Sequence, residues 1–185
     1  MNKTSVDSKN LSIDILLLSF RIELKMFYTI YNDLMNILNT KKLSGFNEYM
    51  ETSFKYRSIV SNINNLLATW EQQLYSFIQT YTNRNINNHY KKLKQEFYKN
   101  FSLRNNLFEK IEEYRHLVNV LKHGESTNSY TELQKINSKF LQPSNEYKYL
   151  KEGHSFNIPI LNISKDTIKE ISDTLESFWK CLDIV

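Results

Sequence analysis

A strip of polar residues in the middle of the chain combines side chain types that can bind and cleave a phosphodiester. Arg115, Asn119 and His123 recur every four residues, so a helix places them on one face, with Glu112 and His116 beside them. His123 could act as a general acid or base, Arg115 could hold a phosphate with paired donors, and Asn119 could orient either partner. The strip is therefore a candidate catalytic site for metal-free cleavage of RNA by its own 2′-hydroxyl.

The same residue types also suit the end of a helix. Lys122 and His123 stand in the last turn of the segment "HLVNVLKHGES", where cations interact favourably with the helix dipole, and Gly124 is typical of a helix C-terminus. Arg115 could pair with Glu112 one turn away. The spacing alone leaves a catalytic and a structural interpretation open.

A basic segment with interleaved aromatic residues precedes this helix. Residues 84–100 contain five lysine and arginine side chains against the single acidic Glu96, together with Tyr90, Phe97 and Tyr98. Basic charge beside aromatic rings suits single-stranded nucleic acid, whose phosphates are neutralised and whose bases stack. The alternative is a solvated lysine face on a short helix whose rings belong to the core. The candidate RNA-binding residues are Lys91, Lys92, Lys94, Lys122 and His116.

Apolar periodicity predicts an all-α bundle of about five helices, built on two long antiparallel ones. In the first long stretch, apolar residues recur at spacings of three to five. Those residues are Ile15, Leu18, Ile22, Phe27, Ile30, Leu34 and Leu38. Helical segments are expected over about 11–38, 46–81, 90–100, 103–123, 131–140 and 165–182, with the segment 131–140 the weakest. Ser102 and Ser164 are the expected N-caps of two of them.

The end of the last predicted helix, "FWKCL", places three large apolar residues together. Phe178, Trp179 and Leu182 could seat the helix on its own bundle or contribute to a dimer face. Core packing is the expected role, because terminal helices of bundles usually dock on their own chain.

Length and composition fit a single domain over residues 1–185, in which 1–10 are flexible and 141–163 form a loop-rich connection. Three glycines and two prolines leave little turn chemistry for a many-stranded sheet. The single cysteine, Cys181, rules out an internal disulfide and favours a reducing compartment. No stretch has the length and apolarity of a membrane span or the cleavage site of a signal peptide, so we expect a cytoplasmic protein without membrane contact.

Several classes of enzyme are excluded by the motifs that this chain lacks. The four histidines show no metal-ligand spacing, so we predict no metal site. Neither a glycine-rich phosphate loop nor a G-x-S-x-G elbow occurs, which argues against nucleotide hydrolases, dehydrogenases and a bound cofactor. The net charge of +4 is mild, so affinity for a polyanion would depend on local clustering.

The helix ending "YRHLVNVLKHGES", preceded by two long helices and a short basic one, resembles the HEPN superfamily of all-α domains. It also resembles bacterial proteins with a "KHGE" ending and a closing helix that contains "FW". The resemblance implies a metal-independent ribonuclease whose composite site forms across a homodimer. Asn119 and His123 match the polar residue and the histidine of the family motif. Val118 stands where the motif has arginine, and the nearest arginine, Arg115, is separated from His123 by seven residues.

Two functions follow as expectations. The first is an RNA-acting, HEPN-like protein, an endoribonuclease or a close non-cleaving relative, in a bacterial antiviral defence or toxin–antitoxin system. It would be a homodimer with the Arg115 strip facing a cleft at the dimer axis. The alternative is a non-catalytic helical adaptor of the same fold that binds a protein partner, with the polar strip serving as an interface network.

Overall fold

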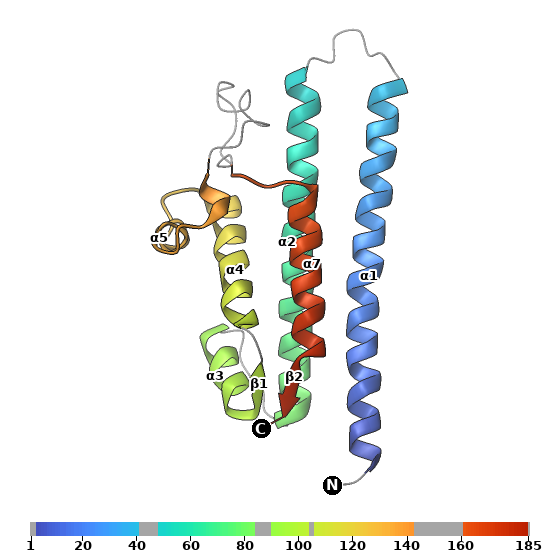
Figure 1. Cartoon of the computed structure of the whole chain (residues 1–185), viewed down its shortest axis with the longest axis vertical. Coiled ribbons are helices and arrows are strands. Elements are labelled where there is room, and N and C mark those ends of the chain that lie inside the picture. The colour runs from blue at the N-terminus through green and yellow to red at the C-terminus, as the bar shows by residue number, and fades with distance from the viewer. Residues whose placement is uncertain (1–2, 41–47, 84–89, 104–105, 143–160, 185) are drawn as a thin grey trace.

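The computed structural model describes residues 3–40, 48–83, 90–103, 106–142 and 161–184, and these form an all-α bundle (Figure 1). This confirms the predicted fold class. In chain order the elements are α1 (Lys3–Thr40), α2 (Glu48–Thr82), α3 (Tyr90–Asn100), β1 (Phe101–Leu103), α4 (Leu107–His123), α5 (Asn128–Lys135), the 3-10 turn η1 (Lys139–Leu141), α7 (Lys165–Lys180) and β2 (Leu182–Ile184).

The two longest helices, α1 and α2, run antiparallel as predicted, and α7 packs against both (Figure 1). Helix α4 lies on the other side of α2 and α7 from α1, with α3 beside its first turns (Figure 1). The candidate polar strip on α4 therefore lies on the side of the bundle that faces away from α1. No helix within the described ranges is long and apolar enough to cross a membrane.

A cluster of buried aromatic rings joins four of the helices. Trp70 of α2 meets Phe178 of α7 edge to face, with ring centroids 5.2 Å apart. Phe97 of α3 lies 5.1 Å from Phe108 of α4 and 5.5 Å from Phe178. All four rings are at most 2% exposed. Aromatic rings bury the largest areas of any side chains, so this cluster fixes how α2, α3, α4 and α7 sit against one another.

The predicted start of the fourth helix is wrong. Residues 101–103 form β1, which pairs antiparallel with β2, and Ser102 lies opposite Asp183 instead of capping a helix. Helix α4 begins at Leu107, after Asn106 in a left-handed conformation. The physical reason is the Phe101 ring, which is buried against Phe97 and is held there by pairing with a strand about 80 residues further along the chain.

The closing helix is confirmed as far as Lys180, but Leu182, which was expected at its end, begins β2 and pairs with Leu103. The Ser164 side chain accepts a hydrogen bond from the Asp166 N–H, and Thr167 completes a capping box at the start of α7. Phe178, Trp179 and Leu182 are all buried in the bundle, which confirms their core role. The short helix expected over 131–140 is α5 followed by η1, and most of the expected loop at 141–163 lies outside the described residues.

The first helix is confirmed, but the periodic residues that predicted it lie largely on its exposed side. Helix α1 begins at Lys3, earlier than expected, and so includes residues expected to be flexible. It buries Leu17, Phe20 and Phe27 against α2 and α7. Ile15, Leu18, Ile22 and Ile30 remain exposed. Periodicity identifies a helix, but it does not tell which of two apolar faces the bundle covers.

We predict that Trp70→Ala lowers the free energy of unfolding by about 3–5 kcal/mol, because it leaves a cavity inside the aromatic cluster. Denaturant unfolding followed by circular dichroism would measure the loss. Ile136→Ala, at a residue that is 55% exposed, is the matched control and should change stability by about 0.5 kcal/mol or less. An equal effect of the two substitutions would show that the cluster does not hold the helices together.

Candidate functional site

The polar strip lies along the border of the buried face of α4. Ile111, Tyr114, Val118 and Leu121 are buried. Glu112, Arg115, His116 and Asn119 are half-buried beside them, and Lys122 and His123 are exposed at the end of the helix. Most of the strip is therefore within reach of neighbouring helices, which decide what its side chains contact.

Arg115 is held between α2 and α3. Its Nε lies 3.5 Å from Oε2 of Glu71, and its guanidinium carbon lies 3.1 Å from the centroid of the Tyr90 ring. The structure thus pairs Arg115 with Glu71 rather than with Glu112, the partner considered from the sequence. A guanidinium has five N–H donors. Among the described residues no partner is found for its terminal nitrogens, so Arg115 is oriented but keeps donors for a further acceptor.

The basic helix α3 lies against this part of α4. Lys94 donates a hydrogen bond of 2.5 Å to Oε2 of Glu112, and its ammonium lies 5.5 Å from the Phe108 ring centroid. The charge of Lys94 is therefore compensated within the chain. Lys91 and Lys92 are exposed, and within the described ranges neither forms an ion pair. The structure brings together the two polar segments that the sequence singled out separately.

His116 and Asn119 both contact Ser129 of α5. The Ser129 hydroxyl lies 3.2 Å from Nδ1 of His116, and it accepts a hydrogen bond of 3.2 Å from the Asn119 amide. Burial lowers the pKa of His116 below its ordinary value, even though the nearby carboxylates of Glu112 and Glu132 act in the opposite direction. These contacts attach α5 to α4, so both side chains have a structural role.

His123 lies apart from the rest of the strip. It is exposed in the last turn of α4, and no hydrogen bond or ion pair of its ring is found in the part of the chain that the structure describes. Gly124, whose φ is +88°, follows it and donates its N–H to Val120, so the residue does end the helix. His123 is eight residues beyond Arg115, roughly 12 Å of helix rise. The two residues are therefore about two turns apart along α4.

A hollow of about 300 Å³ opens on α2 next to the carboxylate that pairs with Arg115. It is lined by Ala68, Glu71, Gln72 and Tyr75. Tyr75 is half-buried there.

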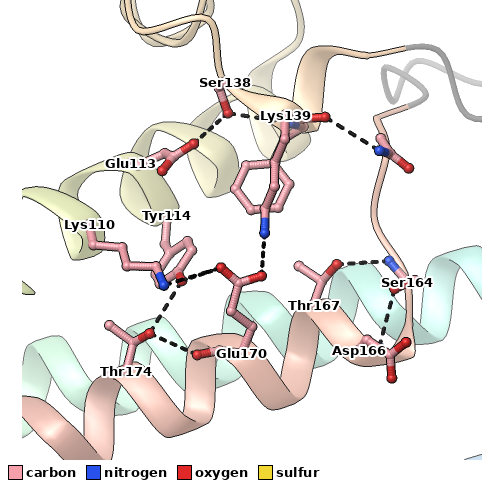
Figure 2. Close-up of polar contacts among 12 residues, drawn as sticks. Lys110, Glu113, Tyr114, Ser138, Lys139, Ser164, Asp166, Thr167, Glu170 and Thr174 are labelled. Atoms are coloured by element: carbon pink, nitrogen blue, oxygen red, sulfur yellow. Dashed lines mark hydrogen bonds and ion pairs between the residues drawn. The ribbon is translucent and has the colours of Figure 1, made fainter.

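A second polar cluster, which the sequence reading missed, is centred on Glu170 of α7 (Figure 2). Its carboxylate accepts a hydrogen bond of 3.0 Å from the Tyr114 hydroxyl and lies between the ammonium groups of Lys110 and Lys139. Burial alone would raise the pKa of Glu170, but the hydrogen bonds from Lys139 and Tyr114 and the charge of Lys110 outweigh it and lower the pKa. Glu170 of α7 thus binds Tyr114 and Lys110 of α4 and Lys139 of η1, and we call these contacts the Glu170 clamp.

The partners of Glu170 come from distant parts of the chain, which is why local spacing does not reveal them. The only local signal is the position of Glu170 between Thr167 and Thr174 on the buried side of α7. An open cavity of about 590 Å³ borders the cluster, lined by residues that include Lys110, Glu170 and Asp173. Within the described ranges, no group of three or more His, Cys, Asp or Glu side chains could hold a metal ion.

Comparison with known proteins does not add to this description. No family model matches the chain, and no curated protein or solved structure matches it significantly. The function must therefore be argued from the geometry of the site.

The lowered pKa of His116 predicts how stability depends on pH. Below about pH 6.5 the unfolded chain binds a proton at this ring more readily than the folded protein does, so stability falls as the pH drops through that value. His116→Gln removes the titration, so we expect its Tm to fall less than that of the intact chain between about pH 7.5 and 5.5.

His123→Gln is the matched control for this experiment, because His123 is exposed on the same helix. It should keep the pH dependence of the intact chain. A pH dependence of Tm that is the same in His116→Gln and the intact chain would contradict the role assigned to burial of His116.

Proposed function

We propose that this chain is a HEPN-like protein that binds RNA across α3 and α4. The observation that supports the proposal is the contact between the basic helix and the polar strip. Lys94 pairs with Glu112, and Tyr90 lies under Arg115, so α3 packs directly beside the guanidinium. Lys91 and Lys92 are exposed on the same short helix, so two segments that each suit RNA are neighbours.

Each part of this surface matches one component of a single-stranded RNA. Arg115 offers its terminal N–H donors to a phosphate oxygen, in an orientation fixed by Glu71 and the Tyr90 ring. Lys91 and Lys92 would neutralise neighbouring phosphates. Tyr98, which is 51% exposed on α3, offers a ring on which a base can stack.

Binding, rather than cutting, is the activity that one chain supports. Cleavage needs a proton acceptor or donor at the phosphate that the cation holds, and His123 lies roughly 12 Å beyond Arg115 along α4. Metal-independent cleavage would require His123 to reach that phosphate by a change of conformation or from a second chain. We therefore propose RNA binding, in a bacterial defence or toxin–antitoxin system, as the function of this HEPN-like chain.

A protein-binding adaptor is the second candidate, and one specific observation favours it. The strip is tied into the fold by Glu71 and by Ser129, and the charges of Arg115 and Lys94 are each faced by a carboxylate. In that interpretation the polar residues hold helices together, and their loss would reduce stability without any effect on RNA.

The two candidates are separated by RNA binding in excess chelator, measured by fluorescence anisotropy with a labelled single-stranded RNA. We expect binding that weakens with salt. In the double variant Lys91→Gln/Lys92→Gln the slope of log affinity against log salt should be smaller by about 1.4, because roughly 0.7 is lost for each phosphate contact to a single strand. The double variant Lys169→Gln/Lys180→Gln on α7 removes the same charge elsewhere and should leave the slope unchanged.

Absence of binding by the intact chain, or an equal loss in both double variants, would contradict the proposal and favour the adaptor. Arg115→Ala gives a further distinction, since it should weaken RNA binding more than its change in Tm can explain. If the intact chain also cuts RNA in chelator, and both His123→Ala and Arg115→Ala abolish the cutting, the proposal extends to catalysis.

A further inference from the structure

Helix α1 carries a long apolar stripe on the side that faces away from the bundle. Each of its residues leaves 50–60% of its surface exposed. These residues are Ile15, Leu18, Ile22, Met26, Ile30 and Ile37. The stripe runs from residue 15 to residue 37, a helix rise of roughly 33 Å. Contiguous exposed apolar surface of this extent is unusual on a monomer and marks an interaction site.

The stripe is symmetric about its middle residue. Ile22 and Ile30 lie four residues on either side of Met26, and Ile15 and Ile37 lie eleven residues on either side. The spacing keeps all of them on one side of a straight helix, because eleven residues complete three turns almost evenly. At offsets of four and eleven residues, α1 therefore carries isoleucine in both directions from Met26.

We propose that the α1 stripe is the interface of a homodimer in which two copies of α1 pack antiparallel about a two-fold axis at Met26. An isologous interface brings the same patch of two subunits together, so it must match itself when reversed. In this arrangement Met26 faces Met26, Ile22 faces Ile30, and Ile15 faces Ile37 of the second copy. A different protein as partner would require no such symmetry.

Leu18, the remaining residue of the stripe, and the nearby Asp33 can be placed in the same pairing. Leu18 falls level with position 34 of the second copy, which is also a leucine and is half-buried. Asp33, an exposed acidic residue between Ile30 and Ile37, falls level with Ser19 of the second copy. The pairing thus sets apolar residues against apolar ones.

The available area agrees with a specific dimer. Six residues that are each at least half exposed, with the flanking atoms of the helix, amount to on the order of 600 Å² per copy, or about 1,200 Å² for the pair, which is the lower end of stable interfaces. Because the residues of the stripe lie outside the core, substitutions there can test the dimer without unfolding the chain.

This dimer differs from the one expected from the sequence. Because α2 and α7 lie between α1 and α4, an axis at Met26 leaves the two Arg115 strips on outer sides of the dimer (Figure 1). The arginine of one copy and the histidine of the other would not meet in a shared cleft. The inference goes beyond RNA binding and does not rest on it, since each copy would keep its own α3–α4 surface.

The test starts with the mass of the intact chain by sedimentation equilibrium. We expect twice the chain mass of 22.2 kDa. Met26→Glu puts two carboxylates face to face at the axis and should raise the dimer Kd by about a hundredfold or more. Asn32→Glu adds the same charge at an exposed position of α1 off the stripe, so it should leave the dimer intact.

Disulfide crosslinking tests the direction of the two helices, with all chains carrying Cys181→Ser. Chains with Ile15→Cys should crosslink efficiently to chains with Ile37→Cys, and each should crosslink poorly to its own kind. A parallel pairing gives the opposite pattern and would overturn the proposal. A monomeric intact chain, or a dimer that Met26→Glu does not weaken, would overturn it as well.

Failure of this inference is distinguishable from failure of the proposed function. The Met26→Glu chain should bind RNA with unchanged affinity per chain, because its α3–α4 surface is intact. Loss of the dimer without loss of RNA binding is therefore the expected combination. Loss of both in this variant would mean that the α1 pairing is part of the RNA site, and it would overturn the independence proposed here.

Discussion

The edge-to-face contact between Trp70 and Phe178 and the rings of Phe97 and Phe108 around it determine how the other helices are placed. Because these rings fill the space between α2, α3, α4 and α7, each helix can present only one face to solvent. For α4 that constraint sets the polar strip at the edge of the core. For α3 it leaves the lysine face outside and places Tyr90 beneath Arg115.

The polar contacts of the fold follow from that placement. They separate the residues of the strip that hold helices together from Arg115, which keeps free donors. His116 and Asn119 attach α5 through Ser129, while Arg115 is oriented by two neighbours and still has donors for a ligand. The clamp at Glu170 fixes the opposite side of α4 against α7. The same helix therefore packs on two sides, and its third side, beside α3, is the one to which we assign RNA.

The sequence predicts the elements of this fold better than it predicts their contacts. The existence of most helices, the Ser164 cap and the buried face of α4 follow from local periodicity and capping, which act within a few residues. The partner of Arg115 is Glu71, 44 residues away, and the partner of β1 is a strand at the end of the chain. Pairings of this kind depend on packing of the whole bundle, so local spacing could not identify them.

The most direct test of the central claim is to map where RNA lies on the intact chain. Ultraviolet crosslinking of a single-stranded RNA containing 4-thiouridine, in excess chelator, followed by mass spectrometry of the peptides, would locate the contact. The account predicts crosslinks in residues 90–100 and 107–123, with Tyr98 among them. Crosslinks confined to α1 or α7, or none at all, would contradict the assignment of the α3–α4 surface to RNA.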